Sequence, residues 1–589
     1  MADDDEDRLL RDTAARIAKA FRPSGTRQLD TDPAPALEAL SSAGLMAMRG
    51  PGGSTGPEAE TAQVAVVVRE IARAMVPVPY LDGEIAAERA SGRPSAAFAL
   101  ALTAADLAGT ARGALDDALE HARMRRQFGR PVGSFQAVAH LAADAAVDLT
   151  AADAIAAHAA WGVDHLPPAD ALAVAAAAHT LSAEAAIAVC ETAIQILGGI
   201  GMTWEHLAHM RLRRAHRLAG TGTPAAPEPL PDLRALDTPP EAVFRAGLVD
   251  WIRTTGPRGD PDDRVAWHRT LHAAGYVGVS FPAEAGGRGL PAAYEAVVND
   301  ELGAHGMPPV PPIGHLAHAL RRFGTPAQRA THLADLLSGA VAWCQGFSEP
   351  DAGSDLAALS TRARRDGDAY RVTGTKIWTS GAVEAERCLL LCRTGEPDGR
   401  HHGLSVLLVP MDAPGVRVEP IVTAFETREF AQVFFDDVRV PAADLLGAEG
   451  DGWAIAMALL GYERGPADIG WTSRLAAALA ETRAQAAADD PRVAERLGHA
   501  ERWLYALRLR VRDRLRGRSP DADPGPEGSL DKLLLTRVDR IVGRLRLDVL
   551  GPDAMTGYLW SRAAGIYGGT EQIQRDIVAQ RVLGLPRGR

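Results

Sequence analysis

The spacing of hydrophobic residues changes once along this 589-residue chain and later changes back. Between Val341 and about Leu446 the residues follow the short-run pattern typical of strands, as in Tyr370-Arg371-Val372-Thr373 and Gln432-Val433-Phe434-Phe435. On both sides of this stretch, apolar residues recur at helical spacing. The sequence therefore predicts a mainly α fold with one central β domain.

Composition limits the class of protein. With 47% hydrophobic residues the chain is long enough for roughly three to five domains. A net charge of −12 argues against non-specific nucleic-acid binding, and the acidic start is the wrong sign for a signal peptide. The 4 cysteines show no metal-ligand spacing, and charged residues interrupt the apolar stretches. We expect a reduced, cytoplasmic protein with no metal and no membrane span.

Proline and glycine divide the chain into two halves. The segment 219–240 is rich in proline and predicts an extended, semi-rigid linker. Before it, residues 101–218 read as a helical bundle without a convincing strand, and Leu81 to Ala96 read as a short connector. The expected parts are 1–90 (helical), 91–218 (bundle), 219–240 (linker), 241–340 (helical), 341–446 (β) and 447–589 (bundle).

Two motifs of the first half have the residue types of a cofactor site. Arg125-Arg126-Gln127-Phe128-Gly129 offers a guanidinium fork for a pyrophosphate and an apolar ring. About 70 residues later, Gln195-Ile196-Leu197-Gly198-Gly199 would let backbone N–H groups approach a ligand closely. Each motif alone is weak evidence, since a helix break also needs glycines. Together in one bundle they form a specific signal.

Three further motifs lie in the second half: Phe347-Ser348-Glu349-Pro350-Asp351-Ala352-Gly353-Ser354-Asp355, Gly374-Thr375-Lys376-Ile377-Trp378-Thr379-Ser380-Gly381 and Ile566-Tyr567-Gly568-Gly569-Thr570-Glu571-Gln572. With the first-half motifs, they resemble the acyl-CoA dehydrogenase family across nearly the whole chain. The resemblance implies a helical domain, a β-barrel-like domain and a four-helix bundle. This unit is duplicated here, with the β domain absent from the first copy, as in the fused, steroid-type members.

The resemblance also implies which residues serve the site. FAD would be held by Arg125, Gln127, Phe128, Gln195, Gly198 and Gly199 of the first half, and by Phe347, Ser348, Gly353, Ser354, Trp378, Thr379, Ser380, Thr570 and Gln572 of the second. Ser354 and Arg464 would contact the acyl-CoA. The second bundle lacks the first-half motifs, having Asp489 to Val493 and Asp548 to Asp553 instead. One chain would thus assemble one complete flavin site from both halves.

The carboxylate that removes the substrate's α-proton in this family is replaced by Gly568, which would contribute a backbone N–H. A subset of the family places this base before an arginine at the start of the bundle, where this chain has Glu463 before Arg464. Glu463 is therefore the expected catalytic base and Glu571 the fallback. The alternative interpretation of Glu463 is a first-turn glutamate that stabilises a helix.

The expected activity is α,β-dehydrogenation of an acyl-CoA thioester to a trans-2-enoyl-CoA, on a bulky, steroid-like acyl group. An electron-transfer flavoprotein would accept the electrons, and a homodimer would form a pseudo-tetramer. Alternatives are a flavin oxidase or monooxygenase of the same fold, a dehydrogenase of a branched or carrier-protein-bound thioester, and a non-catalytic acyl-CoA-binding scaffold.

Overall fold

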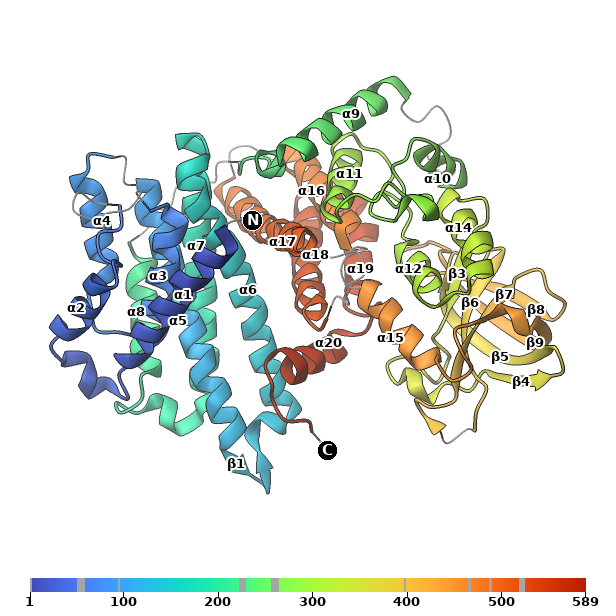
Figure 1. Cartoon of the computed structure of the whole chain (residues 1–589), viewed down its shortest axis with the longest axis horizontal. Helices are drawn as coiled ribbons and strands as arrows, with labels where there is room; N and C mark the ends of the chain where they lie inside the picture. The colour runs from blue at the N-terminus through green and yellow to red at the C-terminus, as the bar shows by residue number, and fades with distance from the viewer. Residues whose placement is uncertain are drawn as a thin grey trace.

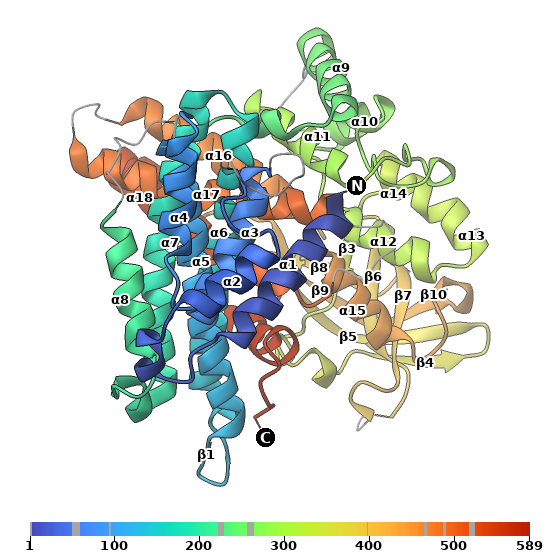
Figure 2. The ribbon, with the colours of Figure 1, turned by 60° about the vertical axis from the view of Figure 1, so that its left-hand side comes forward.

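The computed structural model describes residues 3–49, 59–93, 96–221, 229–255, 264–396, 399–463, 468–486, 490–517 and 525–588. The second half's helical bundle lies between the helices of the first half and the β domain (Figure 1). A view turned by 60° brings the helices of the first half in front of much of the second bundle, with the β domain still on the opposite side (Figure 2).

Small side chains let the helices of the first half approach one another closely. A Cβ at Gly113 would lie 2.2 Å from the Arg73 carbonyl oxygen, so no larger residue fits there. The long helices are α5 (Ala96–Met124), α6 (Gln136–His165) and α7 (Pro168–Leu197), and α1 (Asp3–Ala20), α2 (Ala34–Ser42), α3 (Thr61–Ala74), α4 (Tyr80–Ala90) and α8 (Ala208–Ala219) pack around them. The expected bundle is confirmed.

The structure differs from the expected connector in the first half, and one helix there bears on the expected absence of a membrane span. The segment expected as a connector is mostly helix α4, because the side chains of Tyr80 and Leu81 are buried in the bundle core and hold its first turn. The segment Pro168–Met202 is long and apolar enough to cross a membrane by length and composition alone, and 44% of its most apolar window is buried inside the protein. A core helix passes the same test.

The second half begins with short helices that cover one side of the sheet. They are α9 (Pro239–Thr255), α10 (Arg264–Ala273), α11 (Ala293–Ala304), α12 (Gly314–Phe323), α13 (Pro326–Gln328) and α14 (Ala334–Ser338). Apolar residues of these helices form one core with the sheet, which includes Leu320 of α12 and Leu389 and Val406 of the strands.

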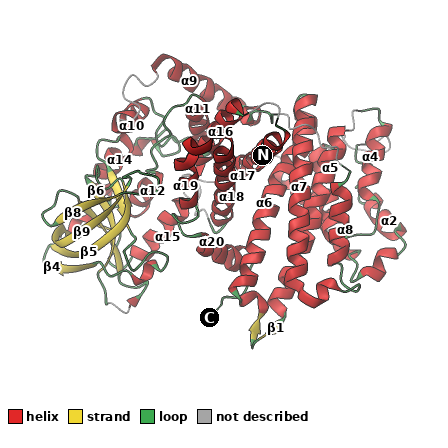
Figure 3. Ribbon diagram, turned by 180° about the vertical axis from the view of Figure 1, so that it is seen from behind, coloured by secondary structure: helices red, strands yellow, loops and turns green. Residues whose placement is uncertain are grey.

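The β domain is one mixed sheet at the end of the molecule away from the first half (Figure 3). Its strand order is β10-β7-β6-β4-β5-β9-β8, with β3 paired to β6. The strands are β3 (Trp343–Gly346), β4 (Arg362–Asp366), β5 (Ala369–Ser380), β6 (Arg387–Arg393), β7 (Leu404–Pro410), β8 (Val416–Ile421), β9 (Phe430–Pro441) and β10 (Leu445–Leu446). Strands β6 and β7 are buried on both faces, which explains their unbroken apolar runs.

The second bundle contacts both other parts. Its helices are α15 (Gly452–Glu463), α16 (Asp468–Gln485), α17 (Pro491–Arg516), α18 (Gly528–Leu550), α19 (Met555–Ala563) and α20 (Glu571–Ile577). Helices α17, α18 and α20 pack on α6 of the first half, and α15 packs on α12 and β7. Among the described residues of the first half, strand structure is confined to the hairpin β1 (Arg126–Gln127) and β2 (Arg130–Pro131), so the single β domain is confirmed.

Candidate active site

The two β-domain motifs are fastened to each other by a buried ion pair. The Lys376 ammonium, fully buried, donates to a Glu349 carboxylate oxygen at 2.7 Å and to the Phe347 carbonyl at 3.0 Å. The Ile377 N–H donates to the Ser348 carbonyl at 2.9 Å. Burial alone would raise the pKa of Glu349, but Lys376 and donors at Ser360 and Thr361 hold that pKa at about 2. Both motifs therefore keep fixed positions relative to one another.

Trp378 is held in a conformation that few side chains adopt. Its φ is +61°, and it lies where the pairing of β5 with β9 shifts register between Lys376 and Thr379. The indole is 56% exposed as a result. A large aromatic ring that is both strained in its backbone and exposed is typical of a residue kept for binding.

Hydroxyl groups around Trp378 fit a flavin. Thr379 is buried, and its Oγ1 has no hydrogen-bond partner among the described residues, so a ligand atom could satisfy it. Ser348 is half-buried, while Ser354 and Ser380 are exposed. A Cβ at Gly353 would meet open space, which leaves room for a ligand. Phe347 differs from these residues because its ring packs in the core, so only its backbone is near the motif surface.

The turn at Gly568 is clamped by a buried amide. Gly568 and Gly569 have φ values of +64° and +91°, which favour glycine at both positions. The Gln574 amide donates to their carbonyls at 2.8 and 3.2 Å and is fully buried. Thr570 Oγ1 accepts from the Ile573 N–H and so caps α20, and Gln572 is exposed. The turn is thus rigid without a carboxylate at Gly568.

A row of aromatic rings joins the β-domain motif to this turn. Trp378 contacts Phe430 of β9, whose ring lies 6.4 Å from that of Trp560 on α19. Trp560 in turn lies 6.4 Å from Tyr567 and 5.9 Å from Trp471 on α16. Phe430, Trp471 and Trp560 belong to no motif, so the sequence did not predict them as site residues. The 10 tryptophans of the chain were the available signal for Trp471 and Trp560.

The first-half motifs lie at the exposed ends of their helices. Phe128 is 91% exposed at the tip of the β1–β2 hairpin, where Phe128 and Gly129 have φ values of +51° and +80°. Arg125 and Gln127 of the hairpin are exposed too, as are Gln195, Gly198 and Gly199 at the end of α7. The hairpin lies at the same edge of the molecule as the C-terminus (Figure 1).

Helix α20, which follows the Gly568 turn, is bonded to the first half close to this hairpin. Asp576 lies 3.0 Å from His140 Nε2, and Arg575 donates to Asp144 at 2.8 Å, both on α6. Arg123, just before the hairpin, donates to the Gly584 carbonyl at 3.2 Å. The structure therefore brings the turn of the second copy and the hairpin of the first toward one junction.

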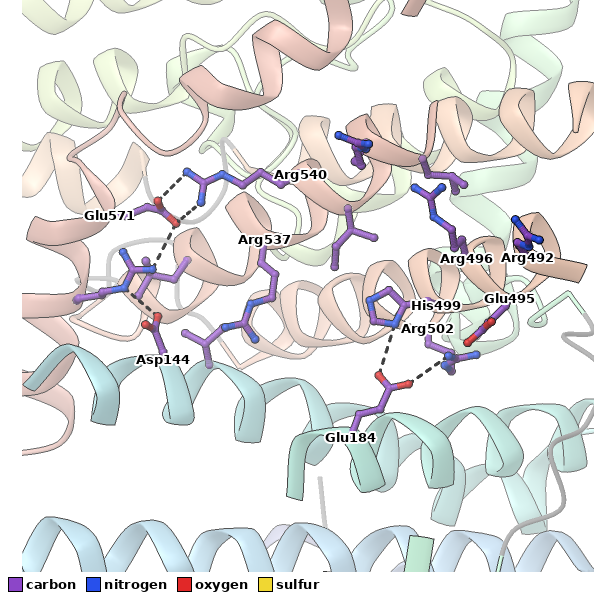
Figure 4. A pocket seen from close by; sticks show the side chains of 16 residues that line it. Asp144, Glu184, Arg492, Glu495, Arg496, His499, Arg502, Arg537, Arg540 and Glu571 are labelled. Atoms are coloured by element: carbon purple, nitrogen blue, oxygen red, sulfur yellow. Dashed lines mark hydrogen bonds and ion pairs between the residues drawn. The ribbon is translucent and has the colours of Figure 1, made fainter. Parts of the chain in front are cut away.

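A cavity of about 760 Å³ lies between the two bundles, and its wall is rich in arginine (Figure 4). Most of these arginines are paired: Arg540 holds Glu571 through two bonds of 2.7 and 3.0 Å, and Arg502 lies 3.4 Å from Glu184. Of the predicted residues, the cavity includes only the fallback base Glu571. This charge network joins α18 and α20 to the first half rather than forming part of the predicted site.

Glu463 is the last residue of α15, and its side chain and all of Arg464 lie outside the described residues. The preceding Tyr462 is buried and stacks on His318 of α12 at 4.7 Å. The alternative interpretation, a first-turn glutamate, does not fit α15, because this helix begins at Gly452 and Glu463 lies eleven residues later. The described part of the chain therefore leaves the role of the Glu463 side chain as a proposal.

Comparisons with known proteins match most of this arrangement, from residue 98 onward. The model of the acyl-CoA dehydrogenase middle domain matches residues 344–438, and that of the N-terminal domain matches 251–340. The C-terminal domain model matches twice, at 98–223 and 450–583. These matches fall on the β domain, the short helices before it and the two bundles.

Among relatives, the acyl-CoA dehydrogenase IpdE1 of Mycobacterium tuberculosis is 42% identical over 346 residues, covering 55% of this chain and 89% of that protein. The acyl-CoA dehydrogenase FadE34 of the same organism is 34% identical over 524 residues, covering 84% of this chain and 72% of that protein. A solved structure titled Tcur3481-Tcur3483 steroid ACAD has a TM-score of 0.54 and 28% identity, covering 61% of this chain and all of that one. The chain therefore belongs to the acyl-CoA dehydrogenase family, as an FAD-dependent enzyme in which the C-terminal domain occurs twice and the middle domain once.

Proposed function

We propose that this enzyme removes the α-proton of a bulky, polycyclic acyl-CoA with Glu463 as the base, and so forms the trans-2-enoyl-CoA. The observation that carries the proposal is the convergence of the Trp378 segment and the Gly568 turn through one row of aromatic rings. FAD, when bound, accepts the hydride from the β-carbon.

The choice of Glu463 as the base is supported by the environments of the two other candidate positions, Gly568 and Glu571. Gly568 has no side chain, and its positive φ would strain any carboxylate residue placed there. Glu571 is already bonded by both guanidinium nitrogens of Arg540. Each of its oxygens accepts one bond of a charge-assisted pair, so this carboxylate already has a structural role. Glu463 is the carboxylate that follows the buried Tyr462 and precedes Trp471 of the aromatic row.

The rest of the site would stabilise the charge that develops when the proton leaves. A thioester α-proton is too weakly acidic for a carboxylate unless the developing enolate oxygen receives hydrogen bonds. The Gly568 backbone N–H is our candidate donor, because Gln574 fixes the turn by binding its carbonyls instead of its N–H groups. A rigid donor needs no rearrangement during the reaction.

Anaerobic flavin reduction tests the base. We expect Glu463→Gln to retain FAD and to slow bleaching of the flavin by substrate by about 10²- to 10⁴-fold, the range for loss of a general base. Glu571→Gln serves as the matched control and should bleach at a rate near that of the wild type. Bleaching at full speed by Glu463→Gln, or loss of bleaching only in Glu571→Gln, would reverse the assignment.

The substrate proposal is supported by relatives whose titles name steroid ACADs and by the aromatic row beside the turn. A panel of butanoyl-, isobutyryl-, octanoyl- and cholanoyl-CoA should show the highest kcat/KM for cholanoyl-CoA. We further propose an electron-transfer flavoprotein as electron acceptor and a homodimer as the assembly. Rapid formation of hydrogen peroxide by the reduced enzyme in air would instead identify an oxidase.

A further inference from the structure

Four aromatic side chains from three separate elements form what we call the aromatic wall: Phe430 of β9, Trp471 of α16, Trp560 of α19, and Tyr567 in the turn that follows α19. Trp560 is its centre, with ring centroids at 6.4 Å from Phe430, 5.9 Å from Trp471 and 6.4 Å from Tyr567. Trp471 and Tyr567 lie 6.2 Å apart, which closes the group. No stretch of sequence places these residues together, so the wall is a product of the tertiary fold.

The rings of the wall are close to parallel. Trp560 makes angles of 14° with Phe430, 23° with Trp471 and 32° with Tyr567. Edge-to-face contacts are common in a packed aromatic core, and Phe425 makes one with Trp560 at 84°. Phe430 and Trp471 instead stack on Trp560, and Tyr567 is tilted from it by 32°, so the rings of the wall share one approximate orientation.

The side chains of the wall are only partly buried. Phe430, Trp471, Trp560 and Tyr567 are all only half-buried. Two adjoining apolar side chains are more open still: Trp378, whose ring contacts Phe430, is 56% exposed, and Ile566, next to Tyr567 in the chain, is 66% exposed. An exposed apolar surface of this kind is characteristic of a ligand-binding face. It is continuous with Gly568, where the reacting carbons of the substrate belong under the proposed function.

Two rings of the wall, those of Trp471 and Tyr567, each have a cation against them. The remaining ring surface of the wall is apolar and favours an apolar ligand. The Lys532 ammonium lies 3.8 Å from the centre of the Tyr567 ring, and the Arg474 guanidinium carbon lies 4.8 Å from that of Trp471. Because Arg474 is on α16 and Lys532 is on α18, these contacts attach the two rings to the second bundle. Indole and phenyl surfaces with few rotatable bonds are then pre-ordered for contact with a rigid apolar body.

We propose that Trp560 is a specificity-determining residue, which together with the rest of the wall receives the fused-ring part of a polycyclic acyl group. The inference rests on the proposed function and adds the residue that selects the substrate. A fused-ring group can cover several parallel rings without losing internal rotations. A linear acyl chain must give up those rotations to lie on the same surface.

The test compares substrates in one protein. For Trp560→Leu we expect kcat/KM for cholanoyl-CoA to fall about tenfold or more, while that for butanoyl-CoA changes by less than about threefold. Trp560→Phe, which keeps a ring, should recover most of the preference. Trp251→Leu is the matched control, since Trp251 is also a half-buried tryptophan among aromatic rings but lies on α9, and it should keep the wild-type ratio.

Flavin content and tryptophan fluorescence separate the possible failures. Wild-type enzyme that holds FAD but dehydrogenates neither acyl-CoA would overturn the proposed function and the inference with it. Active wild type with an unchanged substrate ratio in Trp560→Leu would overturn the inference alone. Loss of FAD from Trp560→Leu would assign the ring to the cofactor instead. Quenching of tryptophan fluorescence by cholanoyl-CoA, reduced in Trp560→Leu but not in Trp251→Leu, would support the inference without relying on turnover.

Discussion

Lys376 is the residue through which the two β-domain motifs depend on each other. Its ammonium is fully buried, and Glu349 is its carboxylate partner. Lys376→Met leaves that carboxylate buried without its cation, so we expect the free energy of unfolding to fall by about 3–5 kcal/mol. Flavin should be lost with it, because the Ser348 and Trp378 segments are no longer fixed.

Urea unfolding followed by fluorescence, together with the ratio of flavin to protein absorbance, measures both effects of the Lys376 change. The double variant Lys376→Met/Glu349→Leu removes both charges and should recover much of the stability. A single variant as stable as the wild type would show that the pair does not hold the two motifs together.

The β1–β2 hairpin is an element whose tip is built for contact rather than for stability. A two-residue turn with positive φ at both positions normally carries Asn-Gly, but here it carries Phe128-Gly129. Phe128→Asn should therefore leave the melting temperature unchanged or raise it. If the ring packs against FAD, the same change should weaken FAD retention by about tenfold.

Differential scanning fluorimetry of the apoenzyme measures the melting temperature of Phe128→Asn, and FAD titration measures its affinity for the cofactor. Leu9→Asn, an exposed apolar residue on α1, is the control for simply removing surface hydrophobicity and should alter neither quantity. Unchanged FAD affinity in Phe128→Asn would remove the hairpin from the flavin site.

Helix α6 is joined to α17 by a histidine that should make the packing of the two bundles sensitive to acid. His158 Nε2 lies 3.0 Å from the Tyr505 hydroxyl, and both side chains are buried. Burial, with a smaller effect of Arg512, lowers the pKa of His158 from 6.5 to about 4. The unfolded chain then binds the proton more readily than the folded one, so the stability of the folded state decreases as the pH falls from 6.5 toward 4.

The loss of stability over this window should be about 3 kcal/mol, at 1.36 kcal/mol for each unit of the shift. Denaturant unfolding between pH 7 and pH 4 gives the slope of the free energy of unfolding against pH. The difference between the slopes of the wild type and His158→Asn measures the contribution of His158. Equal slopes for the two proteins would show that His158 titrates normally.

At the scale of the whole molecule, we propose that the two bundles contribute different parts to one site. The Gly568 turn and its helix α20 belong to the second copy, and α20 is bonded to α6 of the first copy beside the hairpin. The β domain occurs once among the described residues, and the middle-domain model matches the chain once. We therefore expect one FAD per chain and a homodimer with two.

Released flavin divided by protein concentration, with the mass in solution from light scattering, checks this expectation for the whole molecule. Two FAD per chain would require a second site on the first copy and would contradict the proposal that the halves lost complementary sets of contacts. A ratio near one in the wild type and near zero in the Phe128 and Lys376 variants would support a site built from both halves.

Local patterns predicted much of the fold and part of the site. The change of hydrophobic period placed the β domain between helical regions, and proline and glycine marked the joint between the halves, because both signals act within a few residues. The connector before Ala96 was wrong because Tyr80 and Leu81 gain their burial from contacts with distant helices. For Phe347, a motif position did not reveal that its ring packs in the core.

The sequence by itself determined which segments are candidates for the chemistry: Arg125 to Gly129, Ser348, Trp378, Glu463 and the Gly568 turn, each recognised from its immediate neighbours. Only the tertiary structure decided that Trp471 and Trp560 meet Phe430 and Tyr567 in one wall, and that α20 of one copy is bonded to α6 of the other. The physical reason is the distance along the chain over which the determining interactions act. A motif is fixed by backbone geometry over a few residues, whereas an aromatic wall is fixed by the packing of a sheet against a bundle.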